Sequence, residues 1–425
     1  MTHRPIAAFL AAAIASTMLA ACQPSTSDGD AANPRGSTDT PASAPVSAGG
    51  GSTAAPTDLE QLAERLVTQS AAVKEGEIVY ISGRIQDAEL LENIAVNVRK
   101  LGAWPMIGYS SDRLARRMFF DVPEKYDAQA DTAGVAMAKL IDVTISLGNG
   151  TTENLFEGAD PRRAAARGKA NEPVAKAFMD NNVRSVEVGN DLYPTAWRAE
   201  RYGMEEGALA QTFWNGVNLD YSELQARGEQ VKAALAGGNE MHITNPNGTD
   251  LKVRVQGRPV LVSDGIISAD DIKQGGPAVA VYLPAGEVFT TPVPGTAEGK
   301  VVHTRTFYRG KQVDNLTLTF ADGKVTAMTG AGPGYADMKA EYDAVEDPRK
   351  DLFGFVDLGI NPNVSLPANS TVGTWVPAGA VTVGTGVNTW AGGDNSVPYG
   401  MTMSLPGSTV MLDGKPIVEN GVLKL

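Results

Sequence analysis

The stretch IVYISGRIQDAELLENIAVNVRKLGAWPMI, residues 78–107, holds two β-prone runs on either side of one helical pattern. Residues 78–81 form a short apolar run of the kind found in buried strands. Between 90 and 101 the apolar residues recur at helical spacing, and Gly102 follows as a helix stop signal. A second strand is expected at 105–107. Strand, helix and strand in this order predict a βαβ unit and therefore a parallel sheet.

The pattern continues to residue 225 and then changes. Further strands are expected at 143–147 and 183–188, with a helix at 171–179 between them. Beyond a helical pattern, the chain turns to short β-prone runs, at 242–244, 251–255, 259–262, 279–282, 301–308 and 316–320. We therefore expect an α/β protein with a parallel-sheet domain at 58–225 and a β-rich, α+β domain at 226–425.

The N-terminus has the pattern of a bacterial lipoprotein leader. Arg4 precedes a long apolar run that ends in Leu19-Ala20-Ala21-Cys22. A basic start, an apolar core and small residues before a thiol predict a signal peptide at 1–21 and lipidation of Cys22, the only cysteine in the chain. The rest of 22–57 is rich in Ser, Thr, Ala, Gly and Pro, which predicts a flexible tether.

Charge and leader together set the expected surroundings. The chain has 49 acidic and 36 basic side chains and a net charge of −13, which argues against nucleic acid as a partner. No later segment is long and apolar enough to span a bilayer, so we expect membrane contact through the lipid alone. Gln23 follows the cysteine, and in bacterial lipoproteins this implies the outer membrane, with the protein in the cell envelope facing the periplasm.

An ordered series of short phrases covers nearly all of residues 58–425. They include Tyr193-Pro194-Thr195, Gly203-Met204 and the phrases at 217–221, 248–251, 257–260, 264–265, 283–292, 322–324, 358–362 and 412–415. In this order they resemble the thermophilic metallo-aminopeptidases, the aminopeptidase T and PepS group. The resemblance implies that family's fold, and a homodimeric exopeptidase that releases N-terminal residues with two divalent ions, Zn²⁺, Co²⁺ or Mn²⁺.

The resemblance also implies where the metal ligands should lie. Glu287, in LPAGEVFTTP at 283–292, matches the first ligand position. The other positions are occupied by residues that do not match the family's Glu, His and Asp, namely Phe355, Trp375, Thr382, Tyr399 and Met401. Two adjacent cations need several anionic or imidazole ligands to bind and to activate water. The chain has only three histidines, His3, His242 and His303, so no imidazole is available after residue 303.

Two readings of the Glu287 region remain open. Glu287 could stabilise a turn, or it could join Asp357 and Asp394 around one hard cation such as Ca²⁺ or Mg²⁺, which prefers oxygen ligands. Similarly, the aromatic replacements could line a pocket for peptide side chains or could fill the space that the ligands vacated. We interpret the two histidines outside the predicted signal peptide, His242 and His303, as ordinary strand residues.

Three functions follow from these observations. The first is a non-catalytic or repurposed relative of the aminopeptidases that is anchored to the envelope and binds a peptide, without a cofactor. The second is an active aminopeptidase with an altered, carboxylate-rich metal site. The third is a structural or assembly lipoprotein. The sequence assigns no catalytic residue in any of them.

Overall fold

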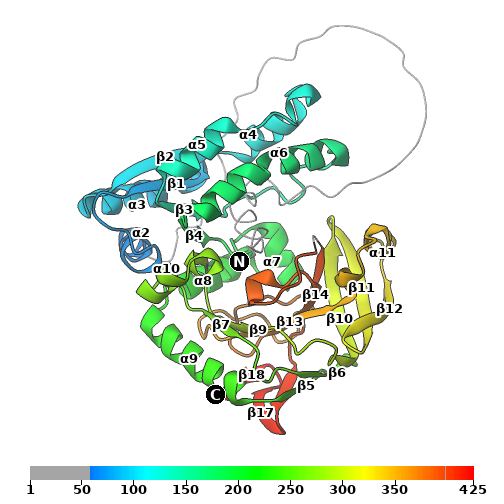
Figure 1. Ribbon diagram of the computed structural model, residues 1–425. Helices are drawn as coiled ribbons and strands as arrows, with labels where there is room; N and C mark the ends of the chain where they lie inside the picture. Colours follow the sequence, from blue (N-terminus) through cyan, green and yellow to red (C-terminus); the bar gives the residue numbers. More distant parts are fainter. Residues whose placement is uncertain (1–57, 398) are drawn as a thin grey trace, which may run out of the picture.

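The structure is a computed structural model that describes residues 58–397 and 399–425. The predicted signal peptide, Cys22 and the predicted tether lie outside these residues. Figure 1 shows the α/β part, with helices around its sheet, packed against a larger β-rich part. The α/β class with a parallel sheet and additional antiparallel sheets is confirmed. Within the described residues, none of the helices has the length and apolar character needed to cross a membrane.

The α/β part contains a five-stranded parallel sheet in the order β2-β1-β3-β4-β8. Its strands are β1 (Ile78–Arg84), β2 (Trp104–Ser110), β3 (Val143–Leu147), β4 (Arg184–Val188) and β8 (Ala280–Leu283). The helices that connect the first four are α3 (Ala88–Lys100), α4 (Asp112–Phe120), α5 (Thr132–Leu140) and α6 (Pro161–Asp180). The opening βαβ unit is therefore present as the sequence predicts.

Local chemistry explains how this unit begins and ends. Helix α2 (Leu59–Arg65) starts at Asp58, whose carboxylate accepts the backbone N–H groups of Glu60 and Gln61. Helix α3 buries its apolar stripe, and Gly102 then adopts a φ of +78°, which favours glycine. All five residues of β3 are buried, as expected for a central strand of a covered parallel sheet.

The fifth strand comes from an unexpected place. The run at 279–282 was expected in the antiparallel β-rich part, but β8 pairs in parallel with β4, with Glu187 opposite Tyr282. The chain thus returns to the first sheet after residue 225 and leaves it again directly before Glu287. Periodicity detects such a strand but does not reveal which sheet it joins, because pairing depends on distant partners.

Three helices lead from the parallel sheet into the β-rich part. They are α7 (Ala196–Tyr202), α8 (Glu206–Val217) and α9 (Tyr221–Gly237). Short helix α10 (Ala269–Gln274) precedes β8. Helix α11 (Tyr335–Ala344) packs on the hairpin strands of the β-rich part.

The β-rich part has two antiparallel sheets. The eight-stranded sheet contains β5 (Glu240–Thr244), β6 (Asp250–Arg254), β10 (Glu298–Tyr308), β11 (Lys311–Ala321), β12 (Lys324–Ala331), β16 (Thr409–Leu412), β17 (Lys415–Glu419) and β18 (Val422–Leu423). The five-stranded sheet has the order β15-β14-β13-β9-β7. Its strands are β7 (Val260–Ser263), β9 (Glu287–Thr290), β13 (Phe353–Gly359), β14 (Val381–Gly386) and β15 (Gly400–Ser404).

The two faces of the five-stranded sheet differ in chemistry. One face contributes Val288, Val356, Leu358, Val383 and Met403 to the main hydrophobic core. Because alternate residues of a strand point to opposite faces, the other face carries a different set, Glu287, Phe289, Phe355, Asp357, Thr382 and Ser404. We call it the polar face.

Candidate functional site

The turn between β8 and β9 places Glu287 at the junction of the two parts. The chain leaves the parallel sheet at Leu283 and enters the five-stranded sheet at Glu287. Gly286 has a φ of +131°, and a Cβ there would lie 2.7 Å from the Cβ of Asn361. The buried Asn361 amide donates to the carbonyl oxygens of Ala285 at 2.6 Å and Gly216 at 3.2 Å. The 283–292 and 358–362 phrases therefore hold each other in place.

Glu287 is half-buried and has few polar partners. The Asn190 amide nitrogen lies 3.4 Å from Glu287 Oε1 and donates to the carbonyl oxygen of Pro284 at 2.9 Å. Loss of solvent raises the pKa of Glu287 to about 7, and the Asn190 hydrogen bond opposes this rise. Glu287 is therefore only partly ionised near neutral pH.

Asp357 is the acidic neighbour of Glu287 on the polar face. It is fully buried, and neither carboxyl oxygen has a hydrogen-bond partner among the described residues. Burial, and next the charge of Glu287, raise the pKa of Asp357 well above its usual range. Ionisation of both carboxyl groups would place two negative charges close together in a buried site, which has a high free-energy cost. The pair therefore retains a proton at neutral pH.

Four aromatic rings pack together over the same face. The aromatic cluster consists of Phe289, Phe355, Trp375 and Trp390. Trp390 lies 4.7 Å from Phe355, 5.1 Å from Phe289 and 6.0 Å from Trp375, as ring centroid separations. Phe355 and Trp375 stack at 5.6 Å with an interplanar angle of 16°. The rings are thus partners of one another, which is the arrangement of a filled space.

The segment that carries Trp375 covers the sheet directly. A Cβ on Gly359 would lie 2.2 Å from the carbonyl oxygen of Pro377 and 2.4 Å from that of Trp375. Gly359 lies opposite Glu287 in the strand register and next but one to Asp357. Only glycine at this position allows the 375–377 segment to approach the strand this closely.

The structure brings some of the predicted site residues together and places others elsewhere. Glu287, Asp357, Phe355, Trp375 and Thr382 share the polar face or the segment above it. Thr382 is opposite Asp357, and its hydroxyl lies 3.2 Å from that of Ser404.

Tyr399 and Met401 are placed differently. Tyr399 packs against Tyr342 of α11, with ring centroids 6.0 Å apart. Met401 is paired with Thr385, so it lies on the apolar face with the core residues. Asp394 is exposed.

Both histidines of the described chain lie on the eight-stranded sheet. His303 on β10 is 5% exposed, its Nδ1 has no hydrogen-bond partner among the described residues, and burial lowers its pKa to about 4. His242 on β5 bonds to Asp250 with Nε2 2.7 Å from Oδ1. Neither imidazole joins the Glu287 pair.

These residues do not fit a site for two metal ions. Such a site needs several anionic or imidazole ligands around each cation. Over 58–397 and 399–425, no group of three or more His, Cys, Asp or Glu side chains is placed to hold a metal ion. The proposed convergence of Glu287, Asp357 and Asp394 is therefore incorrect, because only the first two are neighbours.

A further buried acid was not identified from the sequence. Glu187, near the carboxyl end of β4, is half-buried, and burial raises its pKa to about 7. Its Oε2 accepts the backbone N–H of Asn190 at 3.0 Å, and a Cβ on Gly148 would lie 1.9 Å from its Oε1. The acid between Val186 and Val188 was the available signal. Strand alternation could have placed Phe289 on the same face as Glu287, two residues before it, whereas nothing in the sequence linked Trp390 to the site.

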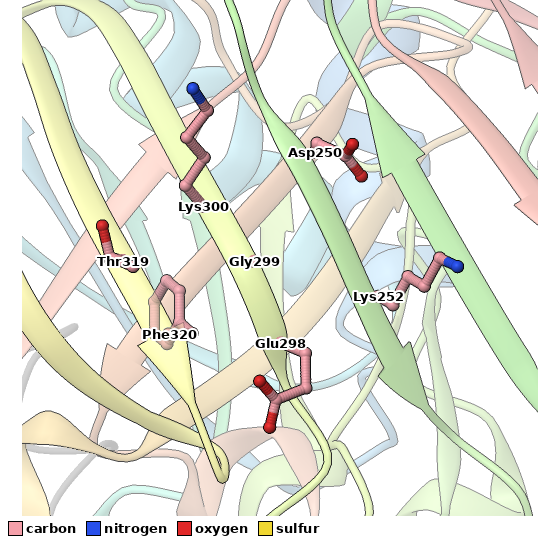
Figure 2. Close-up of a pocket in the computed structure, with 7 residues that line it drawn as sticks. All are labelled: Asp250, Lys252, Glu298, Gly299, Lys300, Thr319 and Phe320. Atoms are coloured by element: carbon pink, nitrogen blue, oxygen red, sulfur yellow. The ribbon is translucent and has the colours of Figure 1, made fainter.

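One hollow lies on the protein surface away from this pair. It measures about 480 Å³ on the eight-stranded sheet. Figure 2 shows Asp250, Lys252, Glu298 and Lys300 around it, projecting from neighbouring strands. Opposite charges are mixed at this surface, so it shows no preference for a charged ligand.

Comparison with known proteins identifies the class. Residues 56–340 match the family described as thermophilic metalloprotease (M29), and the chain therefore belongs to that family. Among curated relatives, aminopeptidase PepS of Streptococcus thermophilus is 26% identical over 306 residues, 64% of this chain and 70% of the relative. Aminopeptidase 2 of Geobacillus stearothermophilus is 24% identical over 315 residues, 69% of this chain and 74% of the relative.

Solved structures confirm the fold. AmpT from Thermus thermophilus superposes with a TM-score of 0.65 at 19% identity, covering 86% of this chain and 99% of AmpT. 2,5-Dihydroxypyridine dioxygenase from Pseudomonas putida KT2440 superposes with a TM-score of 0.55 at 15% identity, covering 87% of this chain and 98% of the dioxygenase. One fold thus carries proteins with different names and chemistries, so the function must be argued from the site.

Proposed function

We propose that this chain is a non-catalytic, peptide-binding member of the M29 aminopeptidase family, anchored to the bacterial cell envelope. The observation that carries the proposal is the polar face of the five-stranded sheet. There, the single matching family glutamate, Glu287, faces one other acid, Asp357, below packed aromatic rings.

The donor set supports the loss of two-metal chemistry. Phe355, Trp375 and Thr382 stand where the family resemblance implies ligands, and none of them offers a carboxylate or an imidazole. Hydrolysis with two metals requires ligands that neutralise both ions and acidify a water, and two carboxyl groups that share a proton do not meet this need.

Peptide binding follows from the family and from the retained architecture. The curated relatives named above are aminopeptidases, and the α/β and β-rich parts still meet at Glu287. A protein that loses its catalytic ligands and keeps its fold can retain ligand binding.

An active aminopeptidase with an altered metal site is the second candidate. The neighbouring carboxyl groups of Glu287 and Asp357 favour it, since oxygen ligands can hold a single hard cation. Metal content of the purified chain, measured by mass spectrometry, separates the two candidates when combined with assays on aminoacyl p-nitroanilides in added Co²⁺, Zn²⁺ or Mn²⁺. We expect no stoichiometric metal and no turnover, but saturable binding of short peptides.

The Glu287→Ala variant is the control for this assay. Turnover that disappears in this variant would refute the non-catalytic proposal and establish the altered enzyme. If the chain binds no metal, turns over no substrate and binds no peptide, the third function, a structural or assembly lipoprotein, replaces the proposal.

The anchor is proposed to be a lipidated Cys22, which lies outside the described residues. Cys22→Ser should abolish incorporation of labelled palmitate and release the protein from the membrane fraction, whereas Ser25→Ala should leave both unchanged. Sucrose-gradient separation of the two membranes then tests the proposed outer-membrane, periplasm-facing location. Incorporation that persists in Cys22→Ser would disprove lipidation at this residue.

We also propose a homodimer. Edge strand β2 supports it, because Trp104 is 56% exposed and Tyr109 is 43% exposed on a strand with one unpaired edge. Natural proteins usually cover or charge such edges. Light scattering of the purified chain should give twice the chain mass, and a monomer at micromolar concentration would contradict the proposal.

A further inference from the structure

A second hollow, of about 230 Å³, lies between α7 and β10. Its walls include Trp197, Arg198, Arg201 and Tyr202 of α7, and Phe307 of β10. Asp191 also lines it. Two guanidinium groups and three aromatic rings therefore meet in one small space, apart from the Glu287 pair.

Arg198 is a buried cation in this space, and the charge of Asp191, which also lines the hollow, stabilises it. Its Nη1 donates to the carbonyl oxygen of Tyr193 at 3.1 Å, and its guanidinium lies 4.3 Å from the Trp197 ring centroid. It forms no ion pair with any residue in the described part of the chain. Burial is the largest effect on its pKa and lowers it. A guanidinium has five N–H donors in a fork, so Arg198 retains donors for a ligand.

The walls around Arg198 are already fixed. Arg201 pairs with Glu153, and its guanidinium lies between Phe307 at 4.1 Å and Trp197 at 4.7 Å. The Trp197 indole N–H donates to the carbonyl oxygen of Thr151 at 3.1 Å. Binding would therefore require little reordering, which favours affinity.

The hollow also borders the segment that covers the polar face. Val372 lines it. Burial raises the pKa of Tyr202 to about 12, and a side-chain hydrogen bond with Thr374 opposes this rise. Trp375 of the aromatic cluster follows directly in the sequence. A ligand here would lie beside that segment, at the meeting of the α/β and β-rich parts.

Size and charge together select the ligand. Pockets for drug-sized molecules usually measure about 300–1,000 Å³, so 230 Å³ suits a single residue. Arginine forks match carboxylates, and the aromatic walls match an apolar or aromatic side chain.

We propose that this hollow binds the C-terminal residue of a peptide, with its free carboxylate on Arg198 and its side chain against the aromatic walls of the hollow. The inference rests on the proposed function, peptide binding, and assigns the part of the peptide that is recognised. Asp191 also lines the hollow and can accept a backbone N–H of the same ligand.

The test uses two probes that differ only at the carboxylate. Calorimetry with the detergent-solubilised full chain should show saturable binding of Ala-Phe, and binding of Ala-Phe amide at least about tenfold weaker. Arg198→Gln should weaken Ala-Phe by a similar factor and leave the amide unchanged. Arg198→Lys keeps the charge and loses the fork, so it should be intermediate.

Arg305→Gln is the matched control, because Arg305 lies on the same strand, β10, and pairs with Asp314 at 3.0 Å. It should bind Ala-Phe as the parent does, and melting temperatures verify that the variants are folded. Phe307→Ala, which removes a wall, should also weaken Ala-Phe.

Equal binding of Ala-Phe and its amide, or unchanged binding in Arg198→Gln, would overturn this inference. Longer peptides that bind equally with free and amidated ends would overturn it while leaving the proposed function intact. Absence of any peptide binding would overturn both.

Discussion

Asp127 and Asp357 are both buried, but their surroundings have opposite effects on them. Asp127 accepts from Arg163 Nε at 2.5 Å and from Arg167 Nε at 2.6 Å, and the Arg163 hydrogen bond is the main reason that its pKa is lowered. Asp357 has no hydrogen-bond partner in the described chain, and its pKa is raised. The first is a charged structural clamp, whereas the second is kept protonated beside Glu287. Burial alone therefore does not decide what a carboxyl group does; the supply of partners decides it.

The largest expected effect on stability comes from the aromatic cluster. Phe355→Ala removes a ring that is 3% exposed and contacts two tryptophans. We expect the free energy of unfolding to fall by about 4 kcal/mol, because the substitution leaves a cavity. Urea denaturation measures it. Tyr126→Ala, at a ring that is 49% exposed, is the control and should cost less than about 1 kcal/mol. Equal losses would show that the cluster contributes no special packing.

The second largest effect on stability is expected at Asp127, which pairs with two arginines. Asp127→Asn leaves two arginines without their anion and should lower the free energy of unfolding by about 3 kcal/mol, at the lower end of the range for broken buried pairs because both arginines reach solvent. Asp121→Asn breaks the exposed pair with Arg117 and should change stability by no more than about 0.5 kcal/mol. A small effect of Asp127→Asn would remove the contrast between the two aspartates.

The pH dependence of stability should distinguish the two acids by sign. The pKa of Glu287 is raised in the fold from near 4.5 to about 7. Its contribution to the free energy of unfolding is therefore fully present below about pH 4.5 and is lost as the pH rises to about 7. The pKa of Asp127 is lowered in the fold, so its contribution to the free energy of unfolding is lost only as the pH falls below about 4.

The double variant Glu287→Gln, Asp357→Asn tests this assignment. Between pH 4.5 and 8 the free energy of unfolding of the variant should fall by about 2 kcal/mol less than that of the parent. Denaturation at each pH measures this difference. Parallel profiles for parent and variant would mean that the pair does not titrate in this window.

The smallest effect concerns two threonines on β14. Thr382 and Thr385 are each 1% exposed, but only Thr382 has a hydroxyl partner, Ser404. Thr382→Val should cost about 1 kcal/mol because it orphans that partner, whereas Thr385→Val should be neutral or stabilising, since its hydroxyl has no partner within the described residues. Thermal melts compare them directly, and a reversed order would contradict the assigned hydrogen bond.

The sequence alone determined the elements whose signals are local. The βαβ unit at 78–107 followed from periodicity and a glycine stop, because strand and helix periods are visible within a dozen residues. The ordered phrases indicated the family that residues 56–340 match. The absence of histidine after residue 303 is likewise a property of the chain itself.

Only the tertiary structure decided how distant segments combine. It placed β8 in the parallel sheet, put Asp357 beside Glu287, and added Phe289 and Trp390 to the aromatic rings. Strand register and sheet membership set these neighbours, and a shift of one residue would turn every such side chain to the other face. Residues 287, 357 and 390 are far apart in the chain, so no local pattern records that they share one face, and their joint burial is what raises the pKa values of the two acids.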